Sequence, residues 1–384
     1  MNDVYIVGID MIPFGRYPER TIPQLGAEAA ALALDDADLT ISDIQALYCG
    51  NLMEAHRLVG QRIMREVGMT GIPVVNCANA CATGATAFRE GLISIKAGLY
   101  DLVLAVGVEQ MGKGLLGGSS RADGFMEEGT LGSNTLPAIF AHIGQDHSRK
   151  YGTTFEQFAK VAVKNHHHST MNPKAMSRRE TPLEEVMKSE MISFPNTKLM
   201  CSINVDGAAA AVLASESAAK RLGLMGRAVR IRASEMTSAQ YTPSEFAIPD
   251  FNRVSQRCAE AAYERAGLGP EDLHLVELHD CFATAEIVHY ENLKLCRPGE
   301  GGQMIDDGTT ALGGRLPVNV SGGLLSKGHP LGATGIANLY EVAMHLRGQA
   351  GQRQVHGARI GMTHVAGGVP SLGSSCVVHI LEKV

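Results

Sequence analysis

The stretches Cys81-Ala82-Thr83-Gly84-Ala85-Thr86 and His329-Pro330-Leu331-Gly332-Ala333-Thr334-Gly335 share one pattern, in which a reactive side chain stands three positions before Gly-Ala-Thr. Each follows a short apolar segment, which ends in Val75-Asn76 in the first case and in Val318-Asn319 in the second. In both copies the residues that follow predict a helix, an apolar strand and a strand of small residues. This internal similarity indicates a chain built from two similar α/β halves.

Short apolar runs alternate with amphipathic segments throughout the chain. Helical spacing marks 22–37 and 251–266, and the second segment stops at Gly267, as helices often do. Strands that alternate with helices predict an α/β fold with largely parallel sheets. The expected strands are 4–9, 46–49, 74–75, 102–108, 208–214, 229–233, 275–278, 317–320, 358–362 and 375–381.

The alternation is interrupted between about 110 and 200, where glycine-rich turns, a helical segment and a charged run follow one another. We interpret this region as an insertion between two strands of one sheet. The predicted organisation is therefore an N-terminal half, 1–225, which contains the insertion, and a C-terminal half, 226–384.

Composition excludes several classes of protein. The 384 residues carry 34 Lys and Arg against 40 Asp and Glu, a net charge of −6, and no basic block exceeds Arg178-Arg179, so nucleic acid is not an expected partner. The small-apolar run 208–214 is far shorter than the roughly 20 residues that span a bilayer. Because Met1-Asn2-Asp3 also lacks the basic start of a signal peptide, we expect a cytoplasmic protein.

The eight cysteines contain no CxxC pair and no zinc spacing, so we expect reduced thiols and no bound metal. Cys81 differs from the others because small residues surround it where a loop enters a helix. A helix N-terminus lowers a thiol pKa and favours the nucleophilic thiolate. The alternative is that both Cys77 and Cys81 merely pack in the core.

Three further motifs could carry chemistry. His279 and Cys281 lie two residues apart after an apolar run and would share one site if the strand stayed extended, unless the histidine is simply a core residue. His329 has glycines on both sides, which leave its ring accessible. The segment His364-Val365-Ala366-Gly367-Gly368 follows a strand, and its backbone N–H groups could form either an oxyanion hole or a plain turn.

Two other polar groups have less specific interpretations. His166-His167-His168 cannot converge on one metal ion if helical, because successive side chains point about 100° apart, so we expect a solvated helix face. Arg178-Arg179 and Lys188 in the insertion could meet the phosphates of a cofactor, or could simply be surface charge.

Taken in order, these four motifs resemble those of the thiolase superfamily, and the resemblance covers nearly the whole chain. His279-Asp280-Cys281-Phe282 is most similar to the motif of the sterol-carrier-protein-linked and archaeal-type thiolases. The resemblance implies a five-layered α-β-α-β-α fold of two βαβαβαββ halves, with the insertion as a loop domain over the substrate. It also implies a homodimer or homotetramer built on the first half.

The same resemblance implies an acyl-CoA C-acyltransferase that makes or cleaves 3-oxoacyl-CoA. Coenzyme A thioesters would be its substrates, with no covalently bound cofactor. Cys81 matches the nucleophile that accepts the acyl group, and His329 matches the base that activates it. His279 matches an oxyanion-hole position, and Cys281 matches the acid/base that acts on the second acyl group.

One departure concerns the C-terminal motif, where the best-known thiolases carry a Cys-x-Gly acid/base and this chain has His364-Val365-Ala366. Cys281 must then supply the second thiol, unless His364 has a secondary role in proton transfer. The N–H of Cys81, together with a backbone N–H near Ala366 or Gly367, would bind the oxyanion of the acyl-enzyme.

Two alternatives remain open from the sequence. A lyase (retro-aldolase) or a C-acylating synthase of the same fold would act on a bulky acyl thioester with a small OB-fold partner subunit, although the retained Cys81 argues against the aldolase. A non-catalytic scaffold or lipid-binding subunit would have lost one or more reactive residues, whereas this chain keeps them all.

Overall fold

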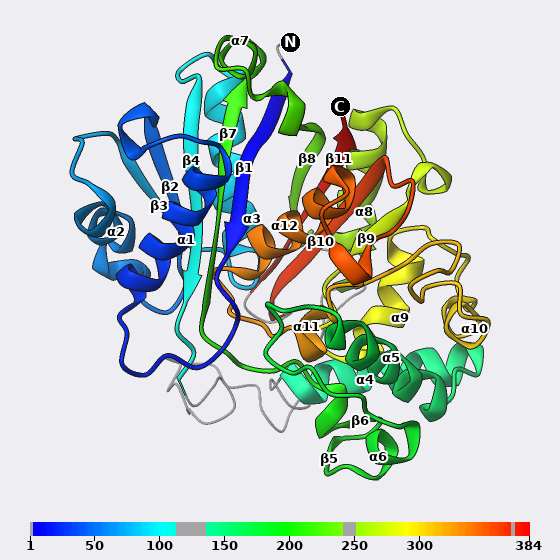
Figure 1. Cartoon of the computed structure of the whole chain (residues 1–384). Helices are drawn as coiled ribbons and strands as arrows, with labels where there is room; N and C mark the ends of the chain where they lie inside the picture. Colours follow the sequence, from blue (N-terminus) through cyan, green and yellow to red (C-terminus); the bar gives the residue numbers. More distant parts are fainter. Residues whose placement is uncertain (1–2, 113–135, 241–250, 370–372) are drawn as a thin grey trace.

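A nine-stranded sheet runs through the computed structural model, which describes residues 3–112, 136–240, 251–369 and 373–384 (Figure 1). Its strands are β1 (Val4–Met11), β2 (Ala46–Gly50), β3 (Val74–Cys77), β4 (Leu102–Glu109), β7 (Gly207–Ser215), β8 (Val229–Ser238), β9 (Leu275–Glu277), β10 (Ile360–Val369) and β11 (Gly373–Lys383). They follow one another in the order β3-β2-β4-β7-β1-β8-β11-β10-β9. Within the described segments, no helix is long and apolar enough to cross a membrane.

The sheet order confirms the internal duplication. The first half reads β3-β2-β4-β7-β1, and the second reads β9-β10-β11-β8 from the opposite edge. In the second half, the segment 317–320 takes the place of β3. It was expected to be a strand, but it forms only an isolated bridge between Val318 and Val276. The two halves still share the same contact, since Leu47 N–H donates to Pro73 O and Val276 N–H donates to Pro317 O, each at 3.0 Å.

The strand directions differ from the expected largely parallel arrangement. Pairs β2–β3, β2–β4 and β9–β10 are parallel, whereas the pairs from β4 through β7, β1, β8 and β11 to β10 are antiparallel. The connection from β10 to β11 is too short for a parallel crossover. The prediction of largely parallel sheets therefore holds at the outer strands and is wrong in the middle of the sheet.

Helices build the five expected layers. The outer face of the first half carries α1 (Ile22–Asp36) and α2 (Val59–Val67), and that of the second half carries α8 (Phe251–Ala266) and α9 (Ala283–Asn292). Between the halves, α3 (Thr83–Lys96) packs against α12 (Thr334–Arg347), as Figure 1 shows. Two residue pairs between β1 and β8 join the half-sheets. Because both halves share one apolar core, the division at 225/226 stays a prediction.

Glycines of the repeated motif allow the central helices to meet. A Cβ built on Gly84 would lie 2.4 Å from the carbonyl oxygen of Gly332, and one on Gly335 would lie 2.3 Å from the nitrogen of Ala85. No real side chain tolerates such distances. The two Gly-Ala-Thr segments therefore touch backbone to backbone, and this contact brings the loops before them together.

We expect Gly335→Ala to lower the free energy of unfolding by about 1–3 kcal/mol, because backbone atoms of α3 must move to admit the methyl group. Urea denaturation monitored by circular dichroism measures the change. Gly226→Ala is the matched control, since a Cβ there meets no atom of the described residues within 4 Å. Equal stability of the two variants would contradict the proposed close contact.

The described part of the insertion packs on the second half. It contains α4 (Leu136–Tyr151), α5 (Phe155–Thr170), α6 (Leu183–Lys188) and the short strands β5 (Met191–Ser193) and β6 (Asn196–Thr197). Helix α4 contacts α9, and α5 contacts α9, α10 (Gly301–Asp306) and α11 (Gly323–Ser326). Figure 1 shows these elements together at the lower right, while α7 (Glu216–Arg221) lies at the opposite end. The insertion thus lies beside the loops that precede His329.

Candidate active site

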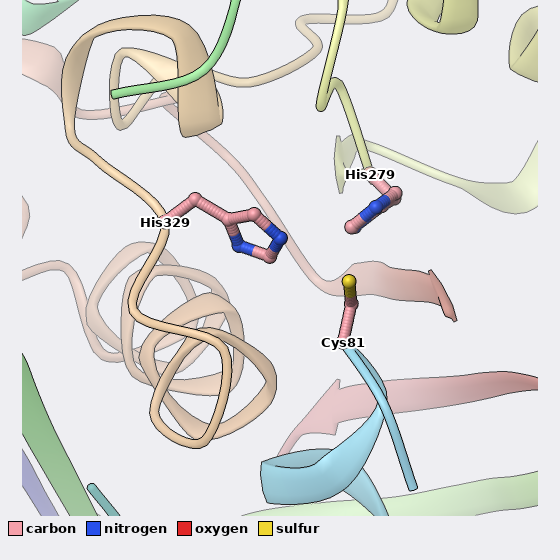
Figure 2. A group of neighbouring side chains, drawn as sticks. All are labelled: Cys81, His279 and His329. Atoms are coloured by element: carbon pink, nitrogen blue, oxygen red, sulfur yellow. The ribbon is translucent and has the colours of Figure 1, made fainter. Parts of the chain in front are cut away.

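Three reactive side chains meet where the two halves join. Figure 2 shows Cys81, His279 and His329 pointing toward one another from three separate segments. One side-chain ligand atom of each, the Cys81 sulfur and one ring nitrogen of each histidine, lies within 4.8 Å of the other two. The histidine rings are 5.1 Å apart and nearly perpendicular, at 74°. The structure therefore groups three residues that the sequence places in different motifs.

A tight loop between β3 and α3 positions Cys81. Ala80 adopts the left-handed conformation, with φ of 47°, which is rare for a residue with a side chain. The Asn79 N–H donates to Thr83 Oγ1 at 2.8 Å, and that hydroxyl donates to Ala80 O at 2.6 Å. These bonds hold the turn just before the sulfur and leave Cys81 partly exposed.

The pKa of the Cys81 thiol is shifted in the direction opposite to the one expected from the sequence. Burial raises the pKa of the Cys81 thiol to about 12, although the backbone N–H groups of Gly368 and of Cys81 itself lower it. The expected thiolate at the helix N-terminus is therefore wrong for the resting site, because loss of solvation outweighs these donors. A neutral thiol needs a base before it can attack.

His329 is arranged to be that base. Its Nδ1 lies 2.8 Å from Thr334 Oγ1, whose single hydrogen is already donated to Pro330 O at 3.0 Å. The Thr334 hydroxyl can then only accept, so Nδ1 carries the ring proton and Nε2 keeps its lone pair. Nε2 is buried and has no partner within the described part of the chain. Burial, with a smaller contribution from Lys327, lowers the pKa of His329 to about 3, so the ring is neutral.

A buried charged pair supports both histidines. Lys327 Nζ is fully buried, 3.0 Å from Asn338 Oδ1 and 3.6 Å from Glu277 Oε2. The Glu277 carboxylate also accepts from the N–H and the hydroxyl of Ser321, at 3.0 and 2.6 Å. These contacts tie the end of β9, two residues before His279, to α12. Sequence reasoning missed this pair, whose only sign was a lysine within an apolar and glycine-rich stretch.

The segment after β9 carries His279 and Cys281. It is not an extended strand as expected, because β9 ends at Glu277 and the Asp280 N–H turns back to Leu278 O at 3.1 Å. Cys281 is buried in an apolar cluster that includes Phe282 and Ala366. Burial raises the pKa of the Cys281 thiol well above its usual value, and the neighbouring Cys81 raises it further.

Asp280 has a structural role between these two residues. Its carboxylate accepts from the N–H groups of Leu324 and Leu325, at 2.8 and 3.3 Å, and from Asn165 Nδ2 at 2.9 Å. Burial, with the nearby Glu286, raises the pKa of Asp280 well above its usual value. The carboxylate therefore holds α11, which leads into the His329 loop, against α5.

His364 lies behind His279 rather than beside Cys81. Its Nδ1 accepts the backbone N–H of His279 at 3.4 Å, and its Nε2 lies 2.9 Å from Ser255 Oγ. The ring of His289 packs against it at 4.5 Å. Both ring nitrogens of His364 are therefore engaged away from the sulfur, which favours support of His279 over a secondary role in proton transfer.

The backbone of β10 covers Cys81. A Cβ on Gly367 would lie 2.6 Å from the nitrogen of Cys81, so only glycine allows this approach. Of the neighbouring N–H groups, that of Gly368 lowers the pKa of the Cys81 thiol and so faces the sulfur. Ala366 packs instead in the Cys281 cluster. The backbone near Ala366 and Gly367, which we expect to contribute to an oxyanion hole, therefore lies against Cys81.

The histidine triplet differs from the expected solvated face. His166 and His168 are buried and only His167 is exposed. His166 Nδ1 lies 2.8 Å from Ser326 Oγ, and His168 Nδ1 lies 3.0 Å from Asn319 O. These contacts hold α5 against loops of the second half. In the same insertion, Arg179 is exposed and paired with Glu185, at 2.6 Å.

Family comparisons cover most of the chain. The description "Thiolase, N-terminal domain" matches residues 4–191, and "Thiolase C-terminal domain-like" matches residues 241–383. Sterol carrier protein 2 of Bos taurus is 40% identical over 99% of this chain and 72% of its own length. Acetyl-CoA acetyltransferase of Methanothermobacter thermautotrophicus is 37% identical over the full length of both chains.

Solved structures give the same result. The Ltp2-ChsH2(DUF35) aldolase superposes with a TM-score of 0.80 at 26% identity, over 99% of this chain and 98% of that one. Acetyl-CoA acetyltransferase from Syntrophomonas wolfei superposes with a TM-score of 0.74 at 20% identity, over 100% and 99% of the chains, and shows the fold alone. Because the two thiolase descriptions and relatives of 37–40% identity match nearly the whole chain, the chain belongs to the thiolase family.

Proposed function

We propose that this thiolase-family acyltransferase makes or cleaves 3-oxoacyl-CoA through an acyl group carried on Cys81. The observation that carries the proposal is a cysteine thiol that shares a site with His279 and with the unpaired Nε2 of His329. Acyl transfer through cysteine requires a nucleophile, a base and donors for an oxyanion. The site offers all three within one cluster.

In the first half-reaction, His329 Nε2 takes the proton of the Cys81 thiol as the sulfur attacks the thioester carbonyl of the acyl-CoA. The N–H of Cys81 and a backbone N–H of β10 near Gly367 bind the oxyanion that forms. The carbon–sulfur bond to coenzyme A then breaks, and His329 returns the proton to the departing thiolate. The products are an acyl-Cys81 thioester and free coenzyme A.

In the second half-reaction, the Cys281 thiol first gives its proton to His329 Nε2, and the resulting thiolate removes a proton from the α-carbon of a second acyl-CoA. His279 and the protonated His329 donate to the enolate oxygen, and the carbanion attacks the acyl group on Cys81. The bond to Cys81 breaks, His329 returns its proton to the Cys81 sulfur, and 3-oxoacyl-CoA leaves. Thiolysis runs the same steps in reverse, with coenzyme A taking the acyl group from Cys81.

Cys281→Ala separates the two half-reactions and tests this proposal. We expect condensation and thiolysis to fall by about 10²–10⁴-fold, because no other thiol replaces the acid/base. Transfer of an acetyl group from acetyl-CoA to Cys81 should continue, as radiolabel trapping measures. Cys201→Ala is the control, since Cys201 is a partly exposed neighbour with no proposed role. Full condensation activity in Cys281→Ala would contradict the assignment.

A retro-aldolase that works with a small OB-fold partner is the second candidate. Its support is the structural likeness to the Ltp2-ChsH2(DUF35) aldolase. The cysteine at 81 favours the acyltransferase, because a retro-aldol cleavage needs no acyl-cysteine. Thiolysis of short 3-oxoacyl-CoA by the purified chain alone would support the acyltransferase, whereas activity that appears only with a partner would favour the aldolase.

We also propose a homodimer or homotetramer built on the first half, and a cytoplasmic location. Strand β3 ends the sheet, and Val75 on it is 43% exposed, so this edge can pair with another chain.

The cysteines support the cytoplasmic location. All eight of them are free thiols, which is typical of a reducing compartment.

A further inference from the structure

The Cys81 cluster has the donor set of a metal site. A thiol and two imidazoles are the ligands that Zn²⁺ takes most readily in proteins, usually in a tetrahedral arrangement. The ligand atoms of such a site lie roughly 3.3–3.7 Å apart. Here the three atoms lie within 4.8 Å of one another, and Figure 2 shows the side chains already facing a common point. Small side-chain rotations would complete the site.

Each of the two histidines also has a ring nitrogen without a partner. His329 Nε2 and His279 Nδ1 are both buried and have no hydrogen-bond partner among the residues that the structure describes. Thr334 holds the proton of His329 on Nδ1, the arrangement by which an outer hydrogen bond orients a metal-bound histidine. One thiol and two imidazoles with unpartnered nitrogens point to a ligand that can accept an electron pair from each of the three side chains.

Charge in the surroundings does not prevent a cation from binding. Lys327, a positive group that acts on His329, is paired with Glu277 and bonded to Asn338, so its charge is partly compensated. Binding would release the Cys81 proton to solvent, and the thiolate would reduce the net charge of the bound ion to +1. The partly exposed Cys81 leaves a route by which the ion can enter.

We infer that Cys81, His279 and His329 bind Zn²⁺ as an inhibitory ion, with the fourth coordination position open. The ion is no cofactor, because the Cys81 sulfur cannot carry both zinc and an acyl group. Zn²⁺ therefore competes with acylation, and a chelator restores activity. The step involves no change of oxidation state.

Cobalt(II) titration of the whole purified chain tests this site without substrate. We expect one Co²⁺ per chain, with a sulfur-to-cobalt charge-transfer band and the strong visible absorption of tetrahedral cobalt. Zn²⁺ should displace the cobalt stoichiometrically. Cys81→Ala should lose the charge-transfer band, and His279→Ala should weaken binding by at least about tenfold. Prior alkylation of the wild-type chain with iodoacetamide should also abolish the band, which guards against a misfolded variant.

Cys296→Ser is the matched control, because this partly exposed thiol lies in another part of the chain and should leave the cobalt spectrum unchanged. A band that persists in Cys81→Ala, or no band in the wild-type chain, would overturn the inference. Since the titration uses no thioester, a positive spectrum with no acyl transfer would contradict only the proposed function.

Discussion

Cys81→Ala is expected to abolish acyl transfer, lowering kcat for thiolysis by at least about 10⁴-fold. The sulfur forms the covalent intermediate, and the cluster of Cys81, His279 and His329 holds no second thiol that could replace it. The measurement is steady-state cleavage of a 3-oxoacyl-CoA with coenzyme A as acceptor. The variant should retain the stability of the parent in urea, since the side chain is only partly buried.

Cys77→Ala is the matched control for this experiment. Cys77 shortly precedes Cys81 in the sequence and is also partly exposed, but it lies in β3, outside the three-residue cluster. We expect it to keep activity close to that of the parent chain. Residual thiolysis of Cys81→Ala at a tenth or more of the parent rate would contradict the role of Cys81.

His329→Asn is expected to produce the second-largest loss, about 10³–10⁵-fold in the rate of Cys81 acylation at neutral pH. Burial raises the pKa of the Cys81 thiol to about 12, so without a base only roughly one molecule in 10⁵ carries a thiolate at pH 7. Because a raised thiol pKa means that ionisation increases with pH, the variant should gain about tenfold in rate per pH unit.

The parent chain should show a much weaker rise over the same range, since its base is already neutral; burial lowers the pKa of His329 to about 3. Pre-steady-state release of coenzyme A between pH 6 and 9 measures both profiles. His167→Asn is the control histidine variant, because His167 is exposed and bonded to Glu180 at 2.7 Å. Parallel pH profiles in the parent and in His329→Asn would argue against the general-base role.

Much of the site could be predicted from the sequence because the repeat itself encodes a contact. Two Gly-Ala-Thr segments that lack side-chain bulk can touch, and their contact places the residues three positions earlier, Cys81 and His329, in one site. The strands before and after these two segments have ordinary apolar patterns, so their positions could also be predicted from the sequence. The five-layered fold followed from the resemblance that these motifs support.

Other features depend on three-dimensional surroundings that no local pattern records. The direction of the Cys81 pKa shift reflects the balance between burial and helix-end donors, and burial prevails. His166 and His168 are buried because α5 packs on the loops of the second half, not because of their own spacing. The expected strand 317–320 is reduced to one bridge, since only Val318 pairs with its neighbour.

The polar support of the two catalytic histidines was equally hidden. Lys327 and Glu277 are far apart in the sequence, and their pairing becomes visible only when the end of α11 lies beside the end of β9. The place of His364 could not be predicted either. Because it follows an expected strand, the sequence suggested that it lies at the reactive centre. The fold instead directs its ring to the backbone of His279.

The central claim is that Cys81 carries the acyl group, and peptide mass spectrometry of the chain after brief exposure to acetyl-CoA tests it most directly. We predict one acetyl group per chain, located on the peptide that contains Cys81 and removed when coenzyme A is added. Prior alkylation of Cys81 should block it. An acetyl group on any other cysteine, or an unmodified Cys81 in a chain that still catalyses thiolysis, would contradict the account.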